Sequence, residues 1–261
     1  MNPAHSFRHK KSLGQHFLRD PDIAERILDA IPAEAADAAV LEIGAGAGVL
    51  TRPLFRAFGR KLYVSEIDHR SVRLIATDPG VSADRILEGD FLKCNLQELP
   101  TPLYIAGNFP YNISSQIVFR MLEHREKIPA LVGMFQREMA VRICASPGNR
   151  DYGVISVWTN LFYFGEILFE LPPEAFDPPP KVHSAVIRLI KRAEVVPGAD
   201  DAGVLKLVKM AFQQRRKKLS NALGAVDGAR QALEGFGWQD LRPEALEPVQ
   251  YVQLYQAIVR S

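Results

Sequence analysis

Short apolar runs separated by amphipathic segments dominate the first two-thirds of the chain. Residues 39–43, 62–65 and 103–105 are almost wholly apolar, and each run ends at a polar or glycine-rich turn. Runs of this length and composition are typical of strands buried on both faces of a parallel sheet. Neighbouring segments carry apolar residues at helical spacing, as over residues 21–31. Successive strand–helix units predict an α/β fold with a doubly wound sheet.

The pattern continues with three more apolar runs and then changes. The runs are residues 130–135, 167–171 and 182–190. Residues 192–203 contain proline, glycine and aspartate and have the composition of a linker. Beyond them the apolar residues keep helical spacing to the end of the sequence. We therefore predict two domains, residues 1–191 with the sheet and a basic N-terminal arm, and residues 192–261 as a small all-helical domain.

Composition narrows the class of protein. The 261 residues are 47% hydrophobic and 24% charged, which is typical of a soluble globular protein with a sizeable core. No apolar run is long enough to span a bilayer, and the basic N-terminus lacks the apolar stretch of a secretory signal. Cys94 and Cys144 match no metal or redox spacing, so we expect no metal and a cytoplasmic location. A net charge of +2 is too small to indicate nucleic-acid binding, so the distribution of charge matters more.

A glycine-rich loop follows the first predicted strand. Gly44, Gly46 and Gly48 alternate with other residues, so the third glycine comes one position earlier than in the phosphate-binding G-x-G-x-x-G pattern. Glu66 ends the next strand about 20 residues later, where an acidic side chain accepts the hydroxyls of a ribose. A surface charge is the alternative for Glu66, and the spacing favours ribose binding. Glu42 adds a second carboxylate near the loop.

Asp90 and Phe91 follow the third strand unit. A carboxylate at this place can accept the amino group of an adenine, with the Phe91 ring flanking the base. The alternative is a turn aspartate beside a core phenylalanine, and this stretch alone does not separate the two.

The segment Asn108-Phe109-Pro110-Tyr111 ends the fourth strand, at the sheet edge where open α/β sheets bind ligands. The amino group of a nucleobase is a poor nucleophile because its lone pair is delocalised into the ring. The Asn108 side-chain carbonyl and the Phe109 backbone carbonyl can accept its hydrogens and so aim the lone pair at an electrophile. Pro110 stiffens the turn, and Tyr111 offers a face on which a base can stack. The alternative is an ordinary strand-to-helix turn.

Phe176 begins a stiff segment, residues 176–181, that contains three consecutive prolines. Such a segment can hold the Phe176 ring over the site as a second stacking face for a base. The alternative is a rigid connector with a buried Phe176.

Basic residues gather at two places. The first is the N-terminal arm, with Arg8, Lys10 and Lys11, and the second is a predicted helix with Arg215, Arg216, Lys217 and Lys218. Both groups can contact RNA phosphates, and both can equally be solvated charges.

Taken together, these motifs resemble those of the ribosomal RNA small-subunit adenine dimethyltransferases, which act on N6 of two adjacent adenines near the 3′ end of 16S rRNA. The resemblance covers nearly the whole chain. The segments that carry it are residues 13–18, 42–46, 108–114, 152–153, 176–186 and 212–217, together with Glu66 and Asp90.

The resemblance implies a class I methyltransferase sheet of seven strands, a small C-terminal helical domain and S-adenosylmethionine as cofactor. The cofactor-binding residues it implies are His16, Leu18, Gly44, Gly46, Glu66, Ile67, Asp90, Phe91 and Asn108. The catalytic segment is Asn108, Phe109, Pro110 and Tyr111, with Phe176 as the second stacking face. The implied partner is 16S rRNA within the 30S subunit, contacted by a monomer that has no membrane partner.

Two residues depart from the family pattern. The family commonly has Asn where this chain has His16, so a side-chain contact from that position to the cofactor is in doubt. It commonly has Leu where this chain has Phe109, a change that a role of the backbone carbonyl tolerates.

Three other functions compete with this interpretation. The nearest is methylation of an adenine of 23S rRNA, although the segment around Phe176 and the Arg215–Lys217 stretch favour the small-subunit type. A nicotinamide-dependent oxidoreductase is disfavoured by the early third glycine and by the Asn-Phe-Pro-Tyr segment. The third is a ribosome-assembly or organellar transcription factor that uses the same fold without catalysis.

Overall fold

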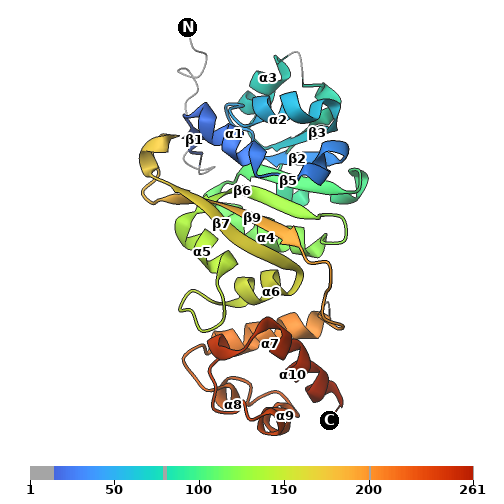
Figure 1. The fold of residues 1–261 in the computed structure, drawn as a ribbon, viewed down its shortest axis with the longest axis vertical. Coiled ribbons are helices and arrows are strands. Elements are labelled where there is room, and N and C mark those ends of the chain that lie inside the picture. Colours follow the sequence, from blue (N-terminus) through green and yellow to red (C-terminus); the bar gives the residue numbers. More distant parts are fainter. Residues whose placement is uncertain (1–14, 79–80, 200, 261) are drawn as a thin grey trace. The chain divides into compact units, whose positions relative to one another are not determined.

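Two compact units make up the part of the chain that the computed structural model describes, residues 15–78, 81–199 and 201–260. The first unit extends to Ala140 and continues with Glu166–Lys191; the second contains Val141–Gly165 and the described chain from Arg192 onward (Figure 1). The chain passes from the first unit to the second for the last time between residues 191 and 192, which is the predicted domain boundary. Residues 141–165 fall within the predicted first domain, but their contacts group them with the C-terminal helices.

A seven-stranded sheet runs through the first unit in the order β4-β3-β2-β5-β6-β9-β7. β2 pairs in parallel with β3 and β5, β3 with β4, and β5 with β6, whereas β6 and β9 are antiparallel. The predicted doubly wound α/β sheet is therefore present. Its strands are β2 Ala39–Ile43, β3 Leu62–Glu66, β4 Ile86–Glu88, β5 Leu103–Asn108, β6 Ala130–Gln136, β7 Tyr163–Leu171 and β9 Ser184–Lys191.

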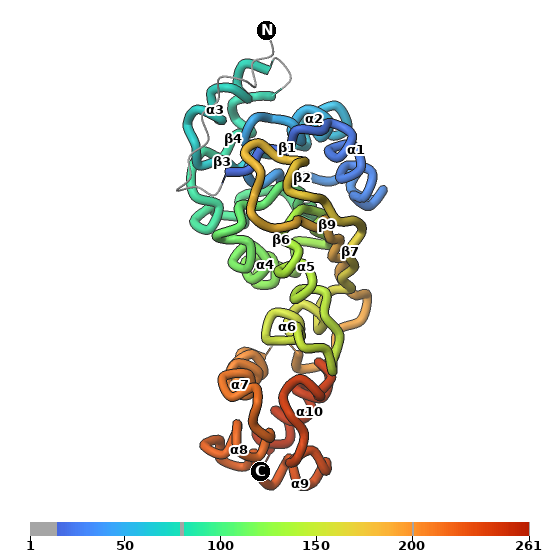
Figure 2. The backbone as a smooth tube through the Cα atoms, turned by 90° about the vertical axis from the view of Figure 1, so that its left-hand side faces the viewer, coloured from blue at the N-terminus to red at the C-terminus, as the bar shows by residue number. Residues whose placement is uncertain are grey.

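Helices cover both faces of this sheet, and Figure 2 shows α1 and α2 on one side of the strands and α4 on the other. On the first side, Ile27, Leu54 and Ile75 pack with Val40 and Val64 in one hydrophobic cluster. Burial of these apolar side chains on a sheet that is covered twice explains why the strands lack polar–apolar alternation. The helices are α1 Pro21–Asp29, α2 Thr51–Phe58, α3 His69–Ala76, α4 Ser114–Glu123 and α5 Arg137–Cys144, the last of which crosses between the units.

The second unit is helical, and aromatic side chains form its centre. The ring centroids of Tyr152 and Phe212 are 6.1 Å apart, and those of Phe212 and Tyr251 are 6.2 Å apart. The two tyrosine hydroxyls donate to the backbone carbonyls of Leu246 and Pro243. No helix among the described residues is long and apolar enough to cross a bilayer. The helices are α6 Val154–Phe162, α7 Ala202–Gln213, α8 Leu219–Ala222, α9 Ala229–Phe236 and α10 Pro248–Arg260.

The basic stretch Arg215–Lys218 does not lie on a helix, and this corrects the prediction. Helix α7 ends at Gln213, and the stretch forms the turn before α8. Gln214 has φ −119° and ψ 46°, outside the helical region, and Lys218 is extended. The Lys217 N–H donates to the Gln214 carbonyl at 2.8 Å, which closes this turn.

A two-stranded antiparallel ribbon links the start of the described chain to the proline-rich segment. Strand β1, Phe17–Leu18, pairs with β8, Phe176–Asp177, so that Leu18 lies opposite Phe176. Both of these side chains are buried, with exposed fractions of 5% and 0%, in the same hydrophobic cluster as α1. The ribbon thereby fixes the backbone just before Phe17 over the sheet.

A buried aromatic ring shapes the end of strand β5. The Phe109 side chain is 1% exposed and lies against Gly107 and Gly133, which are directly opposite each other on β5 and β6. A Cβ atom on Gly133 would come within 2.3 Å of the Phe109 ring and 2.6 Å of the Gly107 carbonyl oxygen. Two glycines on adjacent strands therefore make room for a ring larger than the common leucine.

We predict that Gly133→Ala lowers the free energy of unfolding by about 1–3 kcal/mol because the added methyl group overpacks this position. Phe109→Leu, introduced in the same chain, removes the clash with the ring but not the clash with the Gly107 carbonyl. Part of the loss should then be recovered, which a double-mutant cycle in urea unfolding measures. Gly235→Ala on α9 is the control, because a Cβ atom there meets nothing within 4 Å. Strict additivity of the Gly133 and Phe109 changes would contradict this packing account.

Candidate active site

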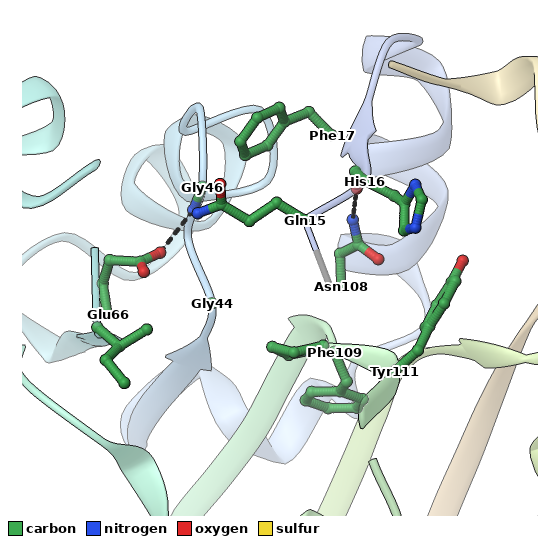
Figure 3. A pocket seen from close by; sticks show the side chains of 11 residues that line it. Gln15, His16, Phe17, Gly44, Gly46, Glu66, Asn108, Phe109 and Tyr111 are labelled. Carbon is green, nitrogen blue, oxygen red and sulfur yellow. Dashed lines mark hydrogen bonds between the residues drawn. The ribbon is translucent and has the colours of Figure 1, made fainter. Parts of the chain in front are cut away.

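The glycine loop between β2 and α2 brings backbone N–H groups to the carboxyl edge of the sheet (Figure 3). The Gly44 N–H donates to the Ser65 carbonyl at 2.9 Å, and the Gly46 N–H donates to Glu66 Oε2 at 2.9 Å. Gly46 has φ +55°, a conformation that side chains with a Cβ rarely adopt. The loop therefore keeps its close approach to the end of β3 only with glycine at this position.

Glu66 lies at the end of β3, as the sequence predicts. Its second oxygen, Oε1, accepts from the Asp68 N–H at 2.8 Å, so both oxygens contact backbone donors. The residue is 5% exposed, and burial raises its pKa despite these hydrogen bonds. The neighbouring Ile67 lines the same cavity as Glu66 and is 50% exposed. A half-exposed aliphatic side chain beside a carboxylate is suited to a ligand with one apolar and one hydroxylated part.

Glu42 is buried beside the glycine loop, and no ligand contact was predicted for it. The residue is 1% exposed, and neither carboxylate oxygen has a hydrogen-bond partner. Burial raises the pKa of Glu42 to about 8, and the nearby Glu66 charge adds to the effect. Glu42 lines a second cavity together with Leu18, Gly46 and Asn108. Below about pH 8 the group is a neutral carboxylic acid at the cavity wall, and a positively charged ligand would favour its ionised form.

Asp90 and Phe91 lie at the neighbouring strand end. The Gly89 N–H donates to the Glu66 carbonyl at 2.8 Å, which brings the turn after β4 beside the end of β3. Asp90 Oδ1 accepts from the Leu92 N–H at 2.9 Å, so the carboxylate caps a short 3₁₀ turn. Phe91 is 4% exposed and belongs to the core, as the alternative of a core phenylalanine predicts. Its ring offers no face to a base in this structure.

Asn108 and Tyr111 form the part of the site at the end of β5. The Asn108 side-chain amide, through Nδ2, donates to the His16 carbonyl at 2.8 Å, which leaves the side-chain oxygen as an acceptor. The Tyr111 hydroxyl lies 2.6 Å from the buried Ser184 Oγ. Burial raises the pKa of Tyr111. The ring of Tyr111 is thus anchored at its far end while the residue lines the cavity.

Residues 15–17 lie across the glycine loop (Figure 3), as the resemblance implies for His16, whereas the places of Gln15 and Phe17 were not predicted. A Cβ atom on Gly46 would be 2.8 Å from the Phe17 ring, so that ring lies directly on the loop. The Gln15 side chain donates to Asp68 Oδ2 at 3.1 Å, while Arg70 holds the pKa of Asp68 well below its usual range. The polar Gln15-His16 pair before two apolar anchors was the available sequence signal.

The predicted stacking role of Phe176 does not agree with the structure. Its side chain is 0% exposed and packs in the hydrophobic cluster behind the β1–β8 ribbon. The ring that stacks on Tyr111 is instead that of His16, with centroids 5.4 Å apart and planes inclined by 25°. The three prolines fix the backbone, but pairing with Leu18 turns Phe176 inward.

The predicted RNA-contacting residues divide into three groups. Arg8, Lys10 and Lys11 lie outside the described residues. Arg215 and Lys218 are held within the second unit, by Glu244 at 3.7 Å and by Asp240 at 2.8 Å respectively. Arg216 and Lys217 are exposed. No group of three or more His, Cys, Asp or Glu side chains in the described ranges is arranged to hold a metal ion.

The family model and two similar proteins agree on one family. The model of a family described as ribosomal RNA adenine dimethylase matches residues 6–258. A protein of Porphyromonas gingivalis named ribosomal RNA small subunit methyltransferase A is 46% identical over 253 residues, covering 94% of this chain and 95% of that protein. A protein of the same name from Flavobacterium johnsoniae is 42% identical over 251 residues, covering 95% of each chain.

Two solved structures share the fold. A dimethyladenosine transferase from Plasmodium falciparum matches with a TM-score of 0.75 and 24% identity, covering 92% of this chain and 96% of that one. The 23S rRNA methyltransferase ErmE matches with a TM-score of 0.68 and 27% identity, covering 93% and 99%. The class I methyltransferase fold is therefore confirmed, and the nicotinamide-dependent alternative is excluded by the family match.

We predict that Glu42 makes the stability of the ligand-free protein fall as the pH rises from about 4.5 to about 8. The folded state keeps a proton on Glu42 up to about pH 8, whereas the unfolded chain loses it near the ordinary value of 4.5. The stabilisation that the protonated Glu42 gives below pH 4.5 is therefore lost as the pH rises from about 4.5 to about 8. Glu42→Gln should remove the trend, and its stability relative to wild type should rise by a few kcal/mol across the window.

Urea unfolding at intervals from pH 5 to pH 9 measures this difference. The exposed Glu123→Gln is the matched control, since its side chain lies at the surface and should shift no pH trend. A stability difference between Glu42→Gln and wild type that stays constant over pH 5–8 would show that Glu42 does not titrate there.

Proposed function

The chain belongs to the ribosomal RNA adenine dimethylase family, and from this premise we propose that it transfers methyl groups from S-adenosylmethionine to N6 of two adjacent adenines near the 3′ end of 16S rRNA. One observation carries the assignment of the site. Asn108, an amide with a free acceptor oxygen, lines both cavities beside the glycine loop. The residue that would orient an amino group thus adjoins the loop that would hold the methyl donor.

The residues around the loop fit S-adenosylmethionine, which supplies an electrophilic methyl group on a sulfonium when bound. A cationic ligand at the cavity that Glu42 and Leu18 line would lower the raised pKa of Glu42 and pair with the carboxylate so formed. Glu66 would accept the ribose hydroxyls, with Ile67 against the adenosine. Asp90 would receive the adenine amino group through its second oxygen, and Gly44 and Gly46 allow close approach of the loop.

The chain's own residues would activate the target adenine by positioning it. The Asn108 side-chain oxygen and the Phe109 carbonyl accept the two amino hydrogens, which directs the nitrogen lone pair toward the methyl donor. The base leaves its stack to reach this point and lies on Tyr111, whose turn Pro110 stiffens. No strong base is required before attack, because the nitrogen becomes acidic once alkylated. Positioning supplies most of the rate.

The small-subunit substrate is favoured over 23S rRNA by the degree of similarity. Proteins named for the small subunit are 40–46% identical to this chain, whereas the 23S rRNA methyltransferase ErmE is 27% identical. We further propose that the chain acts as a monomer on immature 30S subunits.

We predict that Asn108→Ala lowers kcat roughly 100- to 1,000-fold, the usual effect of removing one preorganised hydrogen-bonding group at a reacting centre. The measurement is transfer of tritiated methyl groups to immature 30S subunits that lack the modification, followed by identification of N6,N6-dimethyladenosine in 16S rRNA. Asn112→Ala is the control because that amide is exposed and does not line the cavity, so it should keep most of the activity.

The outcomes separate the alternatives. Label on 23S rRNA and none on 30S subunits would assign the chain to large-subunit methylation. Label on neither, with S-adenosylhomocysteine still bound, would indicate an assembly factor. Full activity of Asn108→Ala would remove Asn108 from the mechanism.

We predict that the paired change Arg216→Ala and Lys217→Ala weakens binding to 30S subunits and lowers the salt dependence of binding. Each phosphate contact contributes about 0.9 to the slope of log K against log salt, so the slope should fall by about 2. Filter binding between 50 and 200 mM salt measures it. Lys206→Ala with Lys209→Ala, two exposed lysines on α7, is the charge-matched control. Equal slopes for the two double variants would leave the turn without a phosphate role.

A further inference from the structure

His16 has a set of contacts that a cofactor-binding role does not explain. Its ring stacks on Tyr111, with centroids 5.4 Å apart and an interplanar angle of 25°. Its Nδ1 lies 2.8 Å from the Pro178 carbonyl oxygen. Its own backbone carbonyl accepts from the Asn108 side chain at 2.8 Å. One residue is therefore bound to three parts of the site, and its side chain and backbone have different partners.

The hydrogen bond to Pro178 fixes the state of the imidazole. A carbonyl oxygen only accepts, so Nδ1 carries the hydrogen and donates it. The ring cannot rotate away from Tyr111 without losing both this hydrogen bond and the stacking contact. Tyr111 is itself held by Ser184 at 2.6 Å, so the pair is anchored at both ends, by β9 and by the residue after β8.

The space between the two rings is too small for a base. Stacked planes lie about 3.4 Å apart, so a base held between His16 and Tyr111 requires roughly 7 Å between the flanking rings. The observed centroid separation is 5.4 Å. Phe176, the other aromatic residue considered for this place, is fully buried. In this structure the stacking partner of Tyr111 is thus an imidazole, a flat nitrogen heterocycle like the base itself.

We propose that the His16 side chain holds the place of the target adenine on Tyr111 and must be displaced before the base can bind. The proposal rests on the function proposed above for Tyr111. The backbone of His16 has the opposite effect: its carbonyl takes the Asn108 amide hydrogen and so keeps the Asn108 oxygen available to accept from the adenine amino group. His16 is a positioning residue whose backbone orients Asn108 and whose ring competes with the substrate.

The direct test is the affinity for adenosine of protein saturated with S-adenosylhomocysteine, which blocks the cofactor site. Nuclear magnetic resonance line shapes of adenosine in the millimolar range give the dissociation constant. His16→Ala leaves no ring on the face of Tyr111 and should bind adenosine roughly fivefold more tightly, the effect expected when one competing aromatic stacking contact is removed. His16→Phe keeps a ring that can stack on Tyr111 and should bind adenosine no more than twofold more tightly.

The opposite result identifies a different role. If His16→Ala binds adenosine more weakly and His16→Phe restores the affinity, His16 is a wall of the base site and the proposal is wrong. Equal affinities for the three proteins, including binding too weak to detect in all of them, also overturn it. Affinity for S-adenosylhomocysteine and thermal unfolding of each variant show whether a change is confined to the base site.

Kinetics on 30S subunits separate this proposal from the proposed function. Displacement predicts that His16→Ala lowers KM for the subunit more than it changes kcat, whereas general damage to the site lowers kcat. If wild-type protein labels 16S rRNA but the variants show no such split, displacement fails and the function stands. If wild-type protein transfers no methyl group while His16→Ala still binds adenosine more tightly, the function fails and displacement stands.

Discussion

Parallel pairing of β2 with both β3 and β5 is the constraint on which the site depends. The register places Ile43 beside Ser65 and Glu42 beside Ala106, so three strands end at one edge of the sheet. The Gly44 N–H closes this edge onto Ser65, and the next loop residues reach Glu66. A shift of one residue in either pairing would turn the polar ends of the strands to the opposite face. Strand register, rather than any single side chain, brings Gly46, Glu66 and Asn108 together.

The two buried glutamates at this edge differ in their hydrogen bonding. Glu66 is buried but contacts two backbone N–H groups, whereas Glu42 is buried with both oxygens unsatisfied. Burial raises the pKa of each, and to about 8 for Glu42. Desolvation without a partner costs free energy in the folded state, and a cationic or donating ligand would offset that cost. The buried Glu42 carboxyl thus lowers the stability of the ligand-free protein at a pH where it ionises.

The N-terminal strand and the proline-rich segment decide what faces Tyr111. Because Leu18 pairs with Phe176, the phenylalanine turns into the core and the ribbon directs the preceding residues over the loop. His16 then stacks on Tyr111, and Phe17 rests on Gly46. The two departures from the family pattern, His16 and Phe109, have different consequences. Phe109 is accommodated by a glycine pair on neighbouring strands, whereas the His16 ring stacks on Tyr111 and covers part of its face.

The sequence by itself determined the parallel sheet, its strand ends and the chemical types at each end, because apolar runs and glycine spacing are local properties of the chain. It placed Glu66, Asn108 and Tyr111 at or just after strand ends, and in the structure these three residues line one cavity. Only the tertiary structure decided which way side chains point and which turns interrupt a periodic pattern. Phe176 and Phe91 are apolar in either role; the pairing of β8 with β1 accompanies the burial of Phe176, and Phe91 is 4% exposed in a short 3₁₀ turn. The Arg215–Lys218 stretch lies in a turn between α7 and α8, where Arg215 and Lys218 pair with Glu244 and Asp240, residues distant in sequence that a local pattern does not reveal.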